Sequence, residues 1–397
     1  MAYLAVLAIL IAFTIAGGIA LYRAMGPEDA TEAAASEHGY DLVSWELRHF
    51  PEKWLHKFQH PFDGRSEEEA DEVVCSYLEL RLLAGKGGEE EERARERMGE
   101  IENEVEDVIE GRVTAVLEDE GLALEPPLFS DLGLVFPPVD FELDATPRVL
   151  AVSPRERIAL RDSYLLTPDL GLDVIERIER EVEAENGEES GVSALVIRTG
   201  GFSSYPSVVF EDASYESLIE TVFHEWLHSY LVFFPLGASY FGSDEARTLN
   251  ESVANIAGNE LARLYLERYG TQQEMCGTAS ETPEVPSPPP GVIEFDFTSE
   301  MRELRNQVEA MLAEGRIEEA EAVMEERRDE FAANGVFIRR LNQAYFAFHG
   351  FYADTAASID PIGPGLQTLL ERAGSAGEFV RVASRITNRE ELGAALD

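Results

Sequence analysis

The apolar and polar positions along the chain predict a mostly helical α+β protein. Apolar residues recur at helical spacing, among many acidic ones, throughout residues 40–125. Four short apolar runs are typical of strands: 141–145, 148–153, 194–198 and 204–210. Helical patterns return at 215–234 and 246–269, and again at 299–333 and 336–353. The pattern therefore predicts a small sheet between helical segments.

The first residues follow a different pattern. From Ala2 to Tyr22 no residue is charged, and as a helix this run would span ~30 Å, about one hydrocarbon core. A cleaved leader is the alternative, but such leaders begin with basic residues and have a shorter apolar region. The run predicts a transmembrane helix that contacts the lipid bilayer through residues 2–22. We therefore expect a single-pass protein of the cell membrane, with the side of its soluble part left open between cytoplasmic and extracytoplasmic.

Composition narrows the function classes. The chain has 397 residues, 45% of them hydrophobic, which is enough for a sizeable core and excludes wholesale disorder. Against 77 Asp and Glu stand 32 Lys and Arg, and a net charge of -45 repels phosphate backbones, so nucleic-acid binding is excluded. The only cysteines are Cys75 and Cys276, too few for a disulfide scaffold, and whether they pair stays open.

The strongest chemical signal is the segment HEWLH at 224–228. On a helix, His224 and His228 lie one turn apart on the same face, where both imidazoles can bind one zinc ion. Glu225 lies beside them and can reach a water molecule as general base without binding the metal. The alternative is two histidines in a core next to an unrelated glutamate.

A catalytic zinc site needs a third protein ligand. Glu251, in the segment NESVA at 250–254, lies on the next helical pattern, and a turn through 235–242 would bring that helix back against the first. Asn255, one turn after Glu251, can hydrogen bond to a ligand imidazole as outer support. In so acidic a chain, the alternatives are that Glu251 is a solvated glutamate or that Asp244 or Glu245, in the expected loop, is the third ligand.

HEWLH followed by NESVA resembles the gluzincin metallopeptidases, the group that includes thermolysin-like and aminopeptidase N-like enzymes. The resemblance covers roughly residues 190–270. It implies one Zn²⁺ per chain, held by His224, His228 and Glu251, with Glu225 as general base. It also implies an edge strand before the zinc helix that binds the substrate backbone. The segment 200–210 stands at that place and makes Gly200, Gly201 and Tyr205 the substrate-binding candidates.

A second set of residues lies near the C-terminus. Asn342, Tyr345, His349 and Tyr352 recur at i, i+3, i+7 and i+10, which predicts one stripe on a helix. Peptide hydrolysis passes through an oxyanion that needs a hydrogen-bond donor, and gluzincins take a Tyr or His from a C-terminal helical region for this. Tyr352 and His349 are therefore the candidates. The alternative is a buried stripe whose members only satisfy one another's hydrogen bonds.

These observations together divide the chain into six parts: a transmembrane anchor at 1–25, a linker at 26–39, a helical domain at 40–125, a zinc metallopeptidase core at 126–275, a Pro-rich loop at 276–293 and a helical part at 294–397 that completes the cleft. The expected function is zinc-dependent hydrolysis of peptide or protein substrates. Two alternatives remain: a membrane-tethered peptide-binding or scaffolding module without turnover, and a zinc hydrolase of non-peptide amides.

Overall fold

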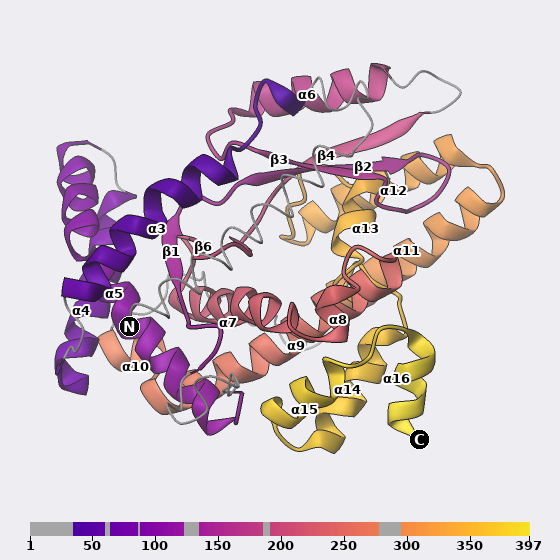
Figure 1. The fold of residues 1–397 in the computed structure, drawn as a ribbon. Coiled ribbons are helices and arrows are strands. Elements are labelled where there is room, and N and C mark those ends of the chain that lie inside the picture. The colour runs from indigo at the N-terminus through magenta and orange to yellow at the C-terminus, as the bar shows by residue number, and fades with distance from the viewer. Residues whose placement is uncertain (1–34, 60–63, 86–87, 123–134, 186–190, 278–294) are drawn as a thin grey trace, which may run out of the picture.

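The computed structural model describes residues 35–59, 64–85, 88–122, 135–185, 191–277 and 295–397. Within these ranges the protein is mostly helical, with two small sheets above a central helix pair (Figure 1). The α+β, mostly helical class expected from the sequence is what the structure has.

The membrane part of the expected fold needs correction. Among the described residues, no helix combines the length and the apolarity needed to cross a membrane. The longest, α5 (Glu89–Asp119), has 31 residues but carries glutamates and arginines along its whole length. The prediction of a transmembrane helix, and of a location in the cell membrane, is therefore wrong for the part of the chain that the structure describes. The run 2–22 itself lies outside the described residues.

Three helices form the N-terminal part: α3 (Leu42–Gln59), α4 (Glu67–Ala84) and α5. Ser66 begins α4 with a capping box in which its side chain and that of Glu69 each accept a backbone N–H of the other residue. Cys75 of α4 forms a disulfide with Cys276 of α10 (Gln272–Cys276), across 201 positions of sequence. The bridge therefore ties this helical part to the end of the chain's central region.

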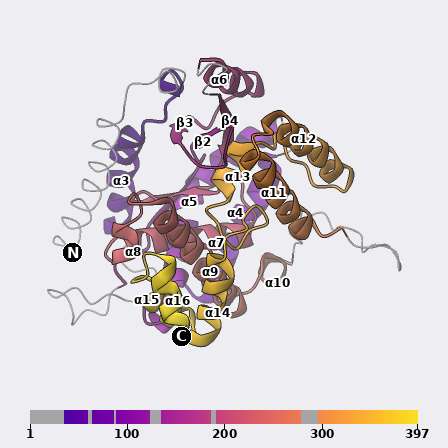
Figure 2. The same ribbon diagram turned by 90° about the vertical axis from the view of Figure 1, so that its right-hand side faces the viewer.

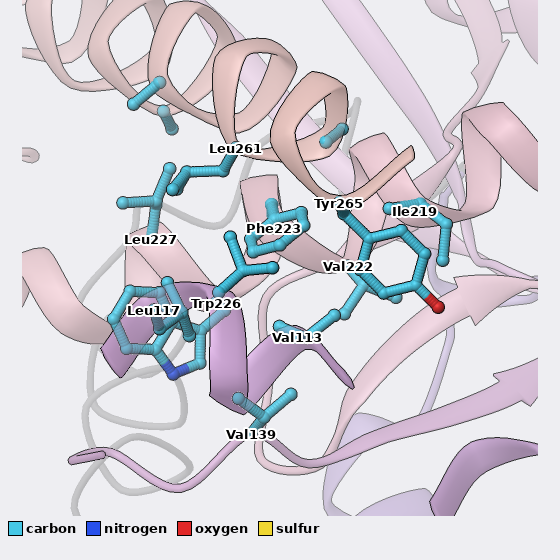
Figure 3. Packing of buried hydrophobic residues seen from close by; sticks show 14 of the residues in the cluster. Val113, Leu117, Val139, Ile219, Val222, Phe223, Trp226, Leu227, Leu261 and Tyr265 are labelled. Atoms are coloured by element: carbon cyan, nitrogen blue, oxygen red, sulfur yellow. The ribbon is translucent and has the colours of Figure 1, made fainter. Parts of the chain in front are cut away.

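The central helices are α7 (Tyr215–Leu231) and α9 (Asp244–Tyr269), joined through the short α8 (Pro235–Ala238). Figure 3 shows Phe223 and Trp226 of α7 packed between Leu261 of α9 and the α5 residues Val113 and Leu117. One hydrophobic cluster thus joins the N-terminal helices to the central pair, and α7 is buried on most of its faces.

The two sheets have three strands each. In one, β6 (Ser207–Phe210) lies between β1 (Phe141–Asp144), which is parallel to it, and β5 (Gly201–Phe202), which is antiparallel. In the other, β2 (Arg148–Pro154) lies between β3 (Asp162–Leu166) and β4 (Val192–Arg198), all antiparallel. Alternate side chains of β2 and β4 face α6 (Leu172–Glu185) and α13 (Gln343–His349), so this sheet is covered on both faces.

The C-terminal helices flank the central pair, as Figure 2 shows from the side. They are α11 (Phe297–Ala313), α12 (Ile317–Ala333), α13, α14 (Ile362–Ala373), α15 (Ala376–Ala383) and α16 (Arg389–Leu396). The helix expected at 336–353 is shorter than the pattern predicts, because it begins only after the N-cap Asn342 and ends before Gly350. Of the Pro-rich segment expected at 276–293, residues from 278 on lie outside the described ranges.

Candidate metal centre

Two well-capped helices bring the metal-ligand candidates together. Ser214 begins α7 by accepting the N–H of Ser217, and Ser243 begins α9 by accepting the N–H of Ala246. The helices cross closely at Gly258, where an added Cβ would lie 3.3 Å from the backbone nitrogen of His224. A glycine two turns after Glu251 therefore lets α9 approach α7 at the first histidine.

His224, His228 and Glu251 converge as their spacing predicts. The two Nε2 atoms are 3.0 Å apart, and Oε2 of Glu251 lies 3.7 Å from Nε2 of His224 and 3.4 Å from Nε2 of His228. One ligand atom from each residue lies within 4.8 Å of the other two. Two imidazole nitrogens and one carboxylate oxygen are the donor set of a catalytic zinc site, so the residues present fit this metal.

The charges of this cluster support the same assignment. Burial lowers the pKa of His228, but the Glu251 carboxylate outweighs it and raises the net value to about 9. Burial alone would raise the pKa of Glu251, yet the neighbouring imidazoles hold it well below its usual range. These shifts favour an ionised Glu251 carboxylate beside a protonated His228, and a divalent cation could take the place of that positive charge.

Asn250 supports His228. Its Oδ1 lies 2.8 Å from Nδ1 of the imidazole, which leaves Nε2 directed at the other two ligands. The sequence pointed to Asn255 for this task, but the Asn255 amide donates to Asp354 Oδ2 at 2.7 Å. Asn255 lies one turn further along α9, so it contacts the segment after α13 instead of a ligand ring.

Glu225 is buried beside His224 and His228, with 6% of its surface exposed. Burial raises the pKa of its carboxyl, the nearby imidazoles lower it, and the net shift is upward. A glutamate in this state holds a proton more readily than an exposed one, as a general base requires. Gly201 of β5 lies directly against it: a Cβ there would be 2.5 Å from Oε1 of Glu225 and 2.6 Å from Cγ2 of Thr221.

Two tyrosines flank Glu251. The Tyr352 ring lies 6.1 Å from the His224 ring, and burial followed by the Glu251 carboxylate raises the pKa of its hydroxyl well above the usual value. Tyr240 donates a hydrogen bond of 2.5 Å to Oε1 of Glu251, the oxygen opposite the one that faces the histidines. Sequence reasoning missed Tyr240, and its only signal was its position in the turn that joins the two ligand helices.

The other C-terminal candidate, His349, lies in a different environment. Its ring packs on Tyr345 at 4.4 Å and on Phe348 at 5.3 Å, and burial lowers its pKa to about 4. The stripe expected through residue 352 is interrupted because α13 ends at His349. The structure therefore brings Tyr352, and not His349, next to His224 and Glu251.

The three substrate-binding candidates lie in different environments. Tyr205 is 2% exposed and its hydroxyl donates to the Pro138 carbonyl, so its side chain is part of the interior. The segment 207–210 is the central strand β6, whereas an edge strand was expected there. The edge is β5, which contains Gly201, and Gly200 precedes it with its carbonyl accepting from Phe210 N.

The remaining sheet edges are covered. Carboxylates of α5 accept the outward N–H groups of Phe141 and Leu143 on β1. Carboxylates of α6 accept those of Ala194 and Val196 on β4, and the segment 38–40 pairs with β3. Within the described ranges, no second strand or carboxylate is hydrogen bonded to the outer edge of β5, and Gly201 of this strand lies against Glu225.

Comparison of the chain with protein-family models, curated proteins and solved structures gives no match. The likeness to gluzincins therefore rests on the residues HEWLH and NESVA, and family membership is not shown.

Proposed function

We propose that this protein is a zinc-dependent peptidase. The observation that carries the proposal is the convergence of His224, His228 and Glu251, next to a buried Glu225 at an uncovered strand edge. Zinc bound by these three residues would supply Lewis-acid polarisation of a carbonyl group and of a water molecule. No larger cofactor is needed for this chemistry.

The residues of the chain have distinct tasks in this proposal. Glu225 accepts a proton from water and passes it to the leaving amine, a task to which its raised pKa is suited. The Tyr352 hydroxyl, kept protonated by its raised pKa, is the donor to the developing oxyanion. The edge of β5 holds the substrate backbone extended, as an added strand, and so favours a peptide over other amides.

The test compares the wild-type chain with Glu225→Gln and, as a matched control on the exposed side of α7, Glu220→Gln. We expect about one zinc per chain in all three proteins. Cleavage of a mixed peptide library should fall by at least ~100-fold in Glu225→Gln alone, because only that variant lacks the proton acceptor.

Three outcomes would contradict the proposal. Absence of bound zinc would remove the metal site. Zinc without cleavage by the wild type would favour a peptide-binding module or a non-peptide amide substrate. Equal loss of cleavage in both variants would show that the effect does not arise at Glu225.

A further inference from the structure

Arg247 lies one turn before Glu251 on α9, on the same face of the helix. Its guanidinium is stacked between two rings, with Cζ 5.7 Å from the centre of the Tyr240 ring and 5.1 Å from that of Phe351. Tyr240 is hydrogen bonded to Glu251, and Phe351 directly precedes Tyr352. The arginine thus lies between a tyrosine that is hydrogen bonded to Glu251 and the residue that precedes Tyr352.

This arginine is poorly paired. The carboxylate it approaches is Asp244, at 3.9 Å, and that side chain is 66% exposed. Its own side chain is only 21% exposed, and Nε is buried without a hydrogen-bond partner. By contrast, Arg263 on the same helix hydrogen bonds to both Glu260 and Glu267. The buried Nε–H of Arg247 therefore keeps the capacity to donate a hydrogen bond to an added carboxylate.

We propose that Arg247 binds a carboxylate of the peptide substrate, supplied by its C-terminus or by an acidic side chain. A guanidinium offers N–H donors in a planar fork that matches a carboxylate, and the two flanking rings fix the plane of this fork in advance. This role for Arg247 rests on the proposed peptidase function, because the bound peptide is a substrate only if the protein cleaves it. It makes Arg247 a specificity-determining residue of that site.

The experiment measures binding without turnover, in the zinc-loaded Glu225→Gln protein. Three hexapeptide libraries serve as probes: free C-terminal acids, the same peptides amidated, and amidated peptides that contain one aspartate. Retention of each library in equilibrium dialysis is compared with that in Glu225→Gln/Arg247→Gln and Glu225→Gln/Arg247→Lys. The control is Glu225→Gln/Arg263→Gln.

We expect the carboxylate-bearing peptides to bind about 10- to 100-fold more tightly than neutral ones, as for a charge-assisted bidentate pair. Arg247→Gln should abolish this ratio, Arg247→Lys should restore part of it, and Arg263→Gln should leave it unchanged. Preference for the free-acid library alone identifies the C-terminus, and preference for the aspartate library alone identifies the side chain.

Equal retention of all three libraries, or a ratio that survives Arg247→Gln, would overturn the inference, as would no retention of any library. Zinc content of each variant shows that the site has folded. Because this readout needs no cleavage, failure of the wild type to cleave peptides overturns the proposed function and leaves the carboxylate result to stand or fall separately.

Discussion

Among single residues, Gly201 decides how much space there is beside Glu225, because a glycine has no side chain. A Cβ on Gly201 would lie 2.5 Å from a carboxylate oxygen of Glu225, whereas one on Gly200 would meet nothing closer than Thr221 Oγ1 at 3.6 Å. The two neighbouring glycines therefore form a natural pair of test and control.

We expect Gly201→Ala to lower kcat/KM for peptide cleavage by about 10- to 100-fold, because displacement of a catalytic group by about 1 Å has an effect of this size. Gly200→Ala should stay close to wild type. Steady-state kinetics of both variants, each with its zinc content measured, checks this. Equal activity of the two variants would show that Glu225 does not depend on this contact.

At the scale of elements, α5 presents a row of carboxylates to the sheet that contains β1. Four of the surrounding acidic residues, Glu106, Glu110, Asp140 and Glu142, lie within 3.6 Å of the Lys53 ammonium. Glu102 stands next to this group, where burial and then the Glu142 charge raise its pKa to about 8. One lysine is too little positive charge for so many carboxylates, so some of them stay protonated near neutral pH.

This predicts a stability that falls as pH rises. Between pH 4.5 and about 8 the unfolded chain has already lost the Glu102 proton while the folded protein keeps it, so the contribution of Glu102 declines across this window. In Glu102→Gln the free energy of unfolding should depend less on pH, and this variant should be more stable than the wild type at pH 8. Urea unfolding over this range tests it, with the exposed Glu96→Gln of the same helix as control. Parallel curves for the wild type and Glu102→Gln would exclude this source of pH dependence.

At the scale of the whole molecule, the Cys75–Cys276 bridge closes a loop of about half the chain. Cross-links of this kind stabilise chiefly by restricting the unfolded chain, typically by about 2–5 kcal/mol. The double variant Cys75→Ala/Cys276→Ala should therefore have a free energy of unfolding about 2–5 kcal/mol lower than the wild type, and unfold at a lower urea concentration.

Zinc binding should be retained in that double variant. The bridge lies beyond the C-terminal end of α9, and Glu251 lies 18 residues before that end, roughly 27 Å along a helix. The wild type treated with reductant serves as the comparison. Loss of zinc in the unbridged protein would show that the two ends of α9 are coupled more tightly than this separation implies.

The local elements and the spacing of the two histidines follow from the sequence alone. The helix expected at 215–234 is α7 (Tyr215–Leu231), that at 246–269 is α9 (Asp244–Tyr269), and the strand at 194–198 lies within β4. These agree because apolar periodicity, serine N-caps and glycine stops act within a few residues of the chain. For the same reason, two histidines four apart on a helix had to share one face.

Which side chains meet across elements depends on tertiary packing. It made β6 a central strand, buried Tyr205, ended α13 at His349 and brought Tyr240 to Glu251. These outcomes depend on strand order, on the loop between α7 and α9, and on the close crossing at Gly258, none of which is encoded in local periodicity.

The pairing of Cys75 with Cys276 and the stacking of Arg247 are of the same kind, since each needs segments that are distant in sequence to pack in one arrangement.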